Sequence, residues 1–66
     1  MVLILSNTKA IITEILSPPE LHFGRWWVEV CVTLEDDSTS YTTSIDRIYL
    51  WQANNIKVGD KTIISI

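Results

Sequence analysis

The 66-residue chain has little of the covalent or metal chemistry on which small proteins often depend. Its single cysteine, Cys31, excludes a disulfide within the chain, and one cysteine with one histidine, His22, is too few for a closed structural zinc site. Its two glycines, Gly24 and Gly59, are too few for a glycine-rich phosphate-binding loop. We therefore expect stability to come from the apolar core and from association with another chain.

Long hydrophobic runs are also missing. The apolar stretch from Val2 to Leu5 is soon followed by the polar Asn7 and the charged Lys9. A signal-peptide core needs about 7 to 15 apolar residues, and a membrane-spanning helix needs about 20. We expect no membrane partner and a cytoplasmic location, which agrees with the unpaired cysteine because a reducing compartment keeps thiols free.

Positive charge is sparse and scattered. The chain has five Lys and Arg residues and eight Asp and Glu residues, which gives a net charge of −3. Because backbone binding depends on neutralising phosphates, tight binding of duplex DNA is not expected. A small barrel that binds single-stranded nucleic acid is the alternative, because aromatic rings can stack on bases. The rings available for this are Phe23, Trp27, Tyr41, Tyr49 and Trp51.

Apolar and β-branched residues are abundant instead. Hydrophobic residues make up 47% of the chain, which is high for so small a protein and favours self-association. Ile, Val, Thr, Tyr and Trp recur throughout, as is typical of strands, and no window has a clear helical period. The sequence predicts strands at 2–5, 9–16, 25–35, 41–45 and 61–66, an irregular loop at 17–24, and turns at 35–40, 54–55 and 58–60.

The clearest strand is residues 25–35, RWWVEVCVTLE. Every second residue from Trp26 to Leu34 is apolar, so one face of this strand should enter the core. Trp27 belongs to the opposite face, between Arg25 and Glu29. An exposed tryptophan among charges usually marks a contact surface, so Trp27 needs cover from a folded-back loop or from another molecule.

The segment from Ser44 to Asn55 fits two interpretations. As a helix, it would be capped by Ser44 and would place Ile48 and Tyr49 on one face; as a strand, residues 48–52 are aromatic and β-branched. We favour the strand. The chain then forms a single all-β domain over residues 1–66, a small barrel of five or six antiparallel strands. The order of strands and loops resembles an SH3-like barrel in a general way, with an OB-like barrel as the alternative.

Residues for catalysis or metal binding are scarce. Cys31 and His22 are the only candidates for a thiolate pair, and about 20 Å of strand separates Arg25 from Cys31 at about 3.3 Å per residue. The carboxylate cluster at residues 35–37 lacks the alternate spacing and glycine of a calcium loop. We expect no enzyme activity, catalytic residue, metal or cofactor.

The sequence therefore predicts a non-enzymatic binding or assembly module. We expect a protein partner, either a second copy of the chain or a larger complex, as in phage or mobile-element accessory proteins. A small-molecule-binding protein, with a pocket between the 17–24 loop and the 44–55 connection, is a third hypothesis. The predicted interaction surface centres on Trp27 and consists of Phe23, Arg25, Trp27, Glu29 and Cys31.

Overall fold

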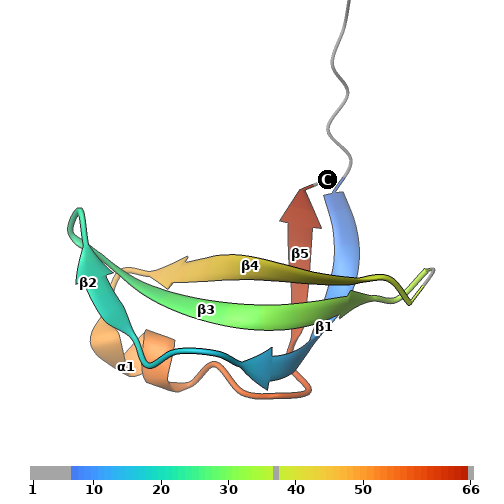
Figure 1. Ribbon diagram of the computed structural model, residues 1–66. Coiled ribbons are helices and arrows are strands. Elements are labelled where there is room, and N and C mark those ends of the chain that lie inside the picture. The colour runs from blue at the N-terminus through green and yellow to red at the C-terminus, as the bar shows by residue number, and fades with distance from the viewer. Residues whose placement is uncertain (1–6, 37, 66) are drawn as a thin grey trace, which may run out of the picture.

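The structure, a computed structural model, describes residues 7–36 and 38–65. These residues form a five-stranded antiparallel sheet and one short helix (Figure 1). The all-β prediction is confirmed in this coarse form. The sheet is not closed on itself, because β4 and β5 each have a single neighbouring strand. The elements are β1 (Asn7–Ile15), β2 (Glu20–His22), β3 (Arg25–Leu34), β4 (Ser40–Arg47), α1 (Leu50–Asn54) and β5 (Lys61–Ser65).

Strand β3 is the centre of the sheet. One of its edges pairs with β4 from Trp26↔Arg47 to Thr33↔Ser40. Its other edge is shared, because β2 pairs with the first three residues of β3 and β1 pairs with residues 30–34. Strand β5 pairs with the far side of β1, so the outer sides of β4 and β5 are open edges of the sheet, as is the outer side of the three-residue β2.

Strand β1 bends where its pairing register shifts. The shift lies between Ile12 and Glu14, which leaves Thr13 as the extra residue of a β-bulge. The Thr13 hydroxyl donates to the carbonyl of Cys31 at 3.3 Å. A bulge increases local bending and twist, and β1 curves beneath β3 in Figure 1.

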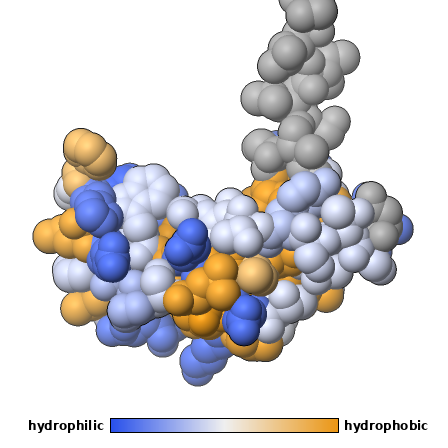
Figure 2. Space-filling model, in the orientation of Figure 1, coloured by the Kyte–Doolittle hydropathy of each residue, from blue (hydrophilic) through white to orange (hydrophobic). Residues whose placement is uncertain are grey.

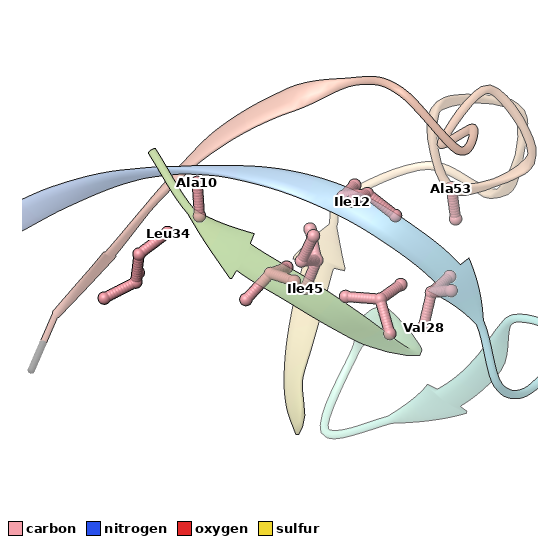
Figure 3. Packing of buried hydrophobic residues seen from close by; sticks show 8 residues of the cluster. Ala10, Ile12, Val28, Leu34, Ile45 and Ala53 are labelled. Carbon is pink, nitrogen blue, oxygen red and sulfur yellow. The ribbon is translucent and has the colours of Figure 1, made fainter. Parts of the chain in front are cut away.

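The core lies on one face of this curled sheet (Figure 3). The alternation predicted for β3 is confirmed, since its residues from Val28 to Leu34 are buried at every second position. Trp26, on the same face, is half-buried and packs against the cluster. The buried residues are Ala10, Ile12, Val28, Val30, Val32, Leu34, Ile45 and Ala53.

The strand favoured for residues 48–52 is wrong, because Leu50–Asn54 forms helix α1. The Tyr49 N–H donates to the side-chain oxygen of Gln52 at 3.2 Å, which satisfies a backbone donor at the start of the helix. Figure 3 shows Ala53 pointing from the helix toward the sheet, where it is buried. Ser44 lies inside β4 and does not cap the helix.

Further expectations have different outcomes. Strand β2 lies inside the segment predicted to be irregular, between residues 17 and 24. The last strand is confirmed over Lys61–Ser65, whereas the strand expected at residues 2–5 lies outside the described residues. Within the part of the chain that the structure describes, no helix is long and apolar enough to cross a membrane.

Candidate protein-interaction surface

The turn between β2 and β3 exposes a phenylalanine in an unfavourable conformation. Two residues, Phe23 and Gly24, connect the strands, with φ angles of 53° and 74°. Positive φ at both positions is typical of type I′ hairpin turns, in which Asn-Gly and Asp-Gly are the preferred pairs. Glycine adopts this conformation freely, whereas a residue with a Cβ atom pays about 1 to 2 kcal/mol. Phe23 is 100% exposed, so burial within its own chain does not offset this cost.

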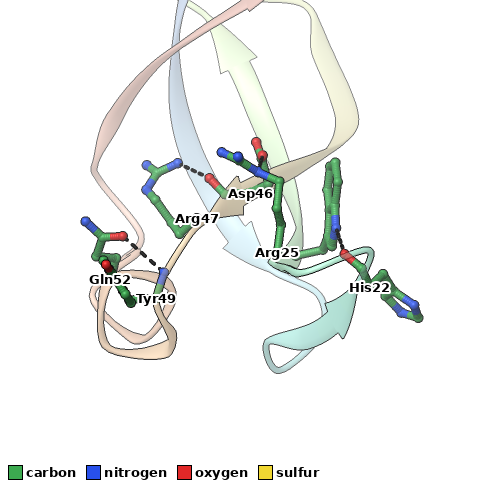
Figure 4. Close-up of polar contacts among 7 residues, drawn as sticks. His22, Arg25, Asp46, Arg47, Tyr49 and Gln52 are labelled. Atoms are coloured by element: carbon green, nitrogen blue, oxygen red, sulfur yellow. Dashed lines mark hydrogen bonds and ion pairs between the residues drawn. The ribbon is translucent and has the colours of Figure 1, made fainter.

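Trp27 lies beside this turn on the outer face of β3. Its indole Nε1 donates to the carbonyl of His22 at 3.1 Å (Figure 4), and its side chain is half-buried. Its register neighbours are Glu20 on β2 and Asp46 on β4. The folded-back hairpin therefore covers Trp27 in part and fixes the indole next to Phe23.

A hollow of about 410 Å³ opens beside the Trp27 indole. Phe23 stands at its rim, and in Figure 2 a hydrophobic projection marks the place of the β2–β3 turn. An apolar knob and a hollow with an aromatic wall are therefore adjacent on one surface. We call this surface the hairpin-tip patch; it consists of Ser17, Glu20, His22, Phe23, Trp27, Glu29 and Ser44.

Carboxylates outnumber cations around Trp27. Arg25 forms an ion pair through its Nε with Asp46 on the neighbouring strand (Figure 4). His22 Nε2 lies 3.2 Å from a carboxylate oxygen of Glu20, and Glu29 lines the hollow. The one arginine near the indole is thus already paired with a carboxylate.

The structure brings together most of the residues predicted for the interaction surface. Phe23, Trp27 and Glu29 line the hollow, and Arg25 lies between Trp27 and the hairpin turn along β3. Cys31 lies farther along β3, where its Sγ is 3.9 Å from the hydroxyl of Thr42, and it is not part of the lining.

Four lining residues were not predicted for the interaction surface, although all four lie in the 17–24 and 44–55 segments between which the sequence predicted a pocket. Ser17 is held against β3 because its hydroxyl accepts the Glu29 N–H at 3.1 Å. Ser44 is on β4 directly opposite Glu29. These residues come from three separate segments, so only the strand register brings them together; the four are Ser17, Glu20, His22 and Ser44.

A second group of exposed apolar side chains surrounds the start of α1. Four consecutive large residues, from Ile48 to Trp51, are exposed, and Trp51 has 64% of its surface accessible. Helix α1 buries only Ala53 among its own residues. The sequence had suggested Tyr49 and Trp51 as available rings, and the structure leaves both exposed.

A third feature is a groove of about 520 Å³ between the open edges of the sheet. One wall is β4 and the other is β5. Its lining is uncharged apart from Asp46 and Arg47 at one end. The full lining is Tyr41, Thr42, Thr43, Ser44, Ile45, Asp46, Arg47, Thr62, Ile63 and Ile64.

The candidate nucleophile and base have separate surroundings. His22 contacts Glu20 at the hairpin tip, whereas Cys31 contacts Thr42 in the middle of the sheet. In residues 7–36 and 38–65, no three His, Cys, Asp or Glu side chains are grouped so that they could hold a metal ion. Comparison of the chain with protein-family models, curated proteins and solved structures found no match.

Proposed function

We propose that this protein is a non-enzymatic assembly module that associates with a second copy of itself through the hairpin-tip patch. The observation that carries the proposal is Phe23, a large aromatic side chain that is fully exposed at a position where its backbone is strained. Residues with backbone strain of this kind cluster at functional sites. Aromatic residues are also the side chains that most often dominate interface energies.

The patch is suited to a symmetric contact because the knob and the hollow are side by side. In a two-fold dimer the same surface of each copy meets the other, so Phe23 of each copy would enter the hollow beside Trp27 of its partner. The ring would lose its contact with water, and the exposed part of Trp27 would be covered. Arg25 and Glu29, of opposite charge, would form the polar rim.

Single-stranded nucleic acid is a poorer fit to the same surface. Stacking proteins combine exposed rings with positive charge that follows the phosphate backbone. Here Arg25 is paired with Asp46, while Glu20 and Glu29 add negative charge around the hollow. The surface therefore favours a protein partner.

We further propose that the open sheet is an incomplete SH3-like barrel and that the protein works in the cytoplasm. Three features support the barrel assignment: the first and last described strands are neighbours, β3 is shared between two sets of partners, and a short helix precedes the last strand. The free Cys31 supports a reducing compartment.

Sedimentation over a range of protein concentrations tests the self-association. We expect a mass that rises with concentration for the unaltered chain and a large loss of association for Phe23→Asn, since asparagine suits the turn but lacks the ring. Val58→Asn is the matched control, because Val58 is another exposed apolar turn residue and lies outside the patch. Equal association of Phe23→Asn and the unaltered chain would overturn the proposal.

A further inference from the structure

The outer edge of β4 presents unpaired backbone groups. The N–H of Leu34 donates to the carbonyl of Thr39 at 2.9 Å, so Leu34 directs its backbone toward β4. Alternate residues of an antiparallel strand bond to the same neighbour, so Val32 and its partner Tyr41 also bond across this pair of strands. The intervening residues of β4 direct their N–H and C=O groups away from β3. In the middle of the strand these residues are Thr42 and Ser44; Asp46 also faces outward, but its carbonyl accepts from the Arg47 guanidinium at 2.7 Å.

The same reasoning applies to β5. The N–H of Ile12 donates to the carbonyl of Asp60 at 2.9 Å, so Ile12 and every second residue before it face β5. Their partners Thr62 and Ile64 bond back to β1. Lys61 and Ile63 therefore direct their backbone groups to the open side, across the groove from β4.

The β4 edge lacks the features that protect edge strands. Natural proteins protect such edges with proline, inward-pointing charge, lysine, bulges or short strands. Strand β4 has eight residues, no proline or lysine, and a register with β3 that runs without a shift from Ser40 to Arg47. A long, regular and unprotected edge is a template for an added strand.

The groove beside this edge is suited to an uncharged extended segment. Tyr41, Thr43 and Ile45 lie on the β4 face that turns toward the core, and Ile64 faces them from β5. These threonine, isoleucine and tyrosine side chains can pack against apolar side chains of an added strand, such as valine, isoleucine or leucine. A charged side chain would be desolvated here without a partner.

The chain itself contains such a segment. Residues 2–5, VLIL, are uncharged and directly precede the polar residues that begin β1. On the β3 side, β1 pairing begins at Ala10↔Leu34, because the chain turns at Glu35 and Asp36. Strand β3 therefore ends at the level of Ala10 of β1.

We propose that the β4 edge accepts residues 2–5 of a second copy as an added strand, with alternate side chains filling the groove. The segment of the same chain is poorly placed for this. Residues 2–5 of the same chain would have to pass from the β1 side of β5 to the open side of β5. This crossing spans two strand spacings, about 10 Å, and uses about three residues. Only one residue separates Leu5 from Asn7, where β1 begins, so the crossing would consume part of the apolar run.

This second contact uses the backbone edge of β4 and does not require the Phe23 ring, although Ser44 lines both surfaces. It is tested in the Phe23→Asn background, where the first contact is removed. We expect this chain to retain concentration-dependent association, and to lose it when residues 2–5 are deleted. Thr42→Pro should also abolish it, because proline removes an outward N–H while leaving the bonds to β3 in place. Thr42→Ala, which keeps that N–H, is the matched control.

Amide hydrogen exchange gives a second measurement that does not depend on the folding of the proline variant. In the Phe23→Asn chain, the amides of Thr42 and Ser44 should exchange more slowly as protein concentration rises. Deletion of residues 2–5 should remove that dependence. A Phe23→Asn chain that is monomeric at all concentrations would overturn the inference, as would association that survives the deletion. Protection that appears only when another protein is added would identify a different occupant and would also overturn it.

Discussion

Phe23 and Gly24 lie in the same turn and both have a positive φ, but the conformational free energy that this φ costs differs between them. No atom lies within 4 Å of a Cβ built on Gly24, so space does not limit that position, and its φ of +74° alone favours glycine. Phe23 has the strain without any burial. The positions that are hardest to predict from sequence are those where function and local preference conflict, and Phe23 is such a position.

Replacing Phe23 by asparagine should make the isolated chain more stable. Asparagine tolerates positive φ because its short polar side chain can bond locally, so we expect a gain of about 1 kcal/mol in the free energy of unfolding. Urea unfolding at a dilute concentration, where copies are separate, measures this. Val58→Asn should give no comparable gain. A Phe23→Asn chain less stable than the original would show that the ring makes stabilising contacts within its own chain.

The fully buried valines of β3 should be the most sensitive residues. Val30→Ala removes two methyl groups from the core and leaves a cavity, which should cost about 2 kcal/mol. Cys31→Ala, one position along on the outer face, is the control and should cost clearly less because Cys31 is only half-buried. Urea midpoints of the two variants provide the comparison; equal losses would contradict the placement of the core.

At the scale of elements, the sequence was informative where a pattern was long. The alternation over β3 extends across ten residues, and its two faces are as predicted. Strand β2 has three residues and α1 has five, which is too short for a period of two or of 3.6 to show. The helix at Leu50–Asn54 was predicted as a strand because its aromatic and β-branched neighbours favour strands. Its burial of Ala53 depends on a tertiary contact that no local pattern encodes.

The turn before β5 provides a prediction at this scale. The Lys57 N–H donates to a carboxylate oxygen of Asp60 at 2.9 Å, and the Asp60 N–H donates to the Lys57 carbonyl at 3.1 Å. Asp60→Ala removes the side-chain acceptor and should cost about 1 kcal/mol. Asp60→Asn keeps an acceptor oxygen and should recover most of the loss. Thermal unfolding of both variants measures the difference, and equal losses would argue against this hydrogen bond.

At the scale of the whole molecule, the interaction surfaces form because strands that are far apart in the sequence pair with one another. The hollow beside Trp27 combines residues from β2, β3, β4 and the segment before β2, and the groove lies between two strands on either side of α1. The sequence identified Trp27 and its neighbours as a contact surface because one strand was enough to show their face. The predicted pocket between the 17–24 loop and the 44–55 connection contains Ser17 and Ser44, but the sequence did not place them beside Trp27 and did not predict the groove, since both depend on the pairing of separate strands.

The central claim is that Phe23 of one copy enters the hollow beside Trp27 of another. A mixture of isotope-labelled and unlabelled protein, at a concentration where association occurs, tests it by nuclear Overhauser effects that arise only between copies. We predict such effects between the Phe23 ring and the Trp27 indole. Association with no intermolecular effect between these two side chains would contradict the account.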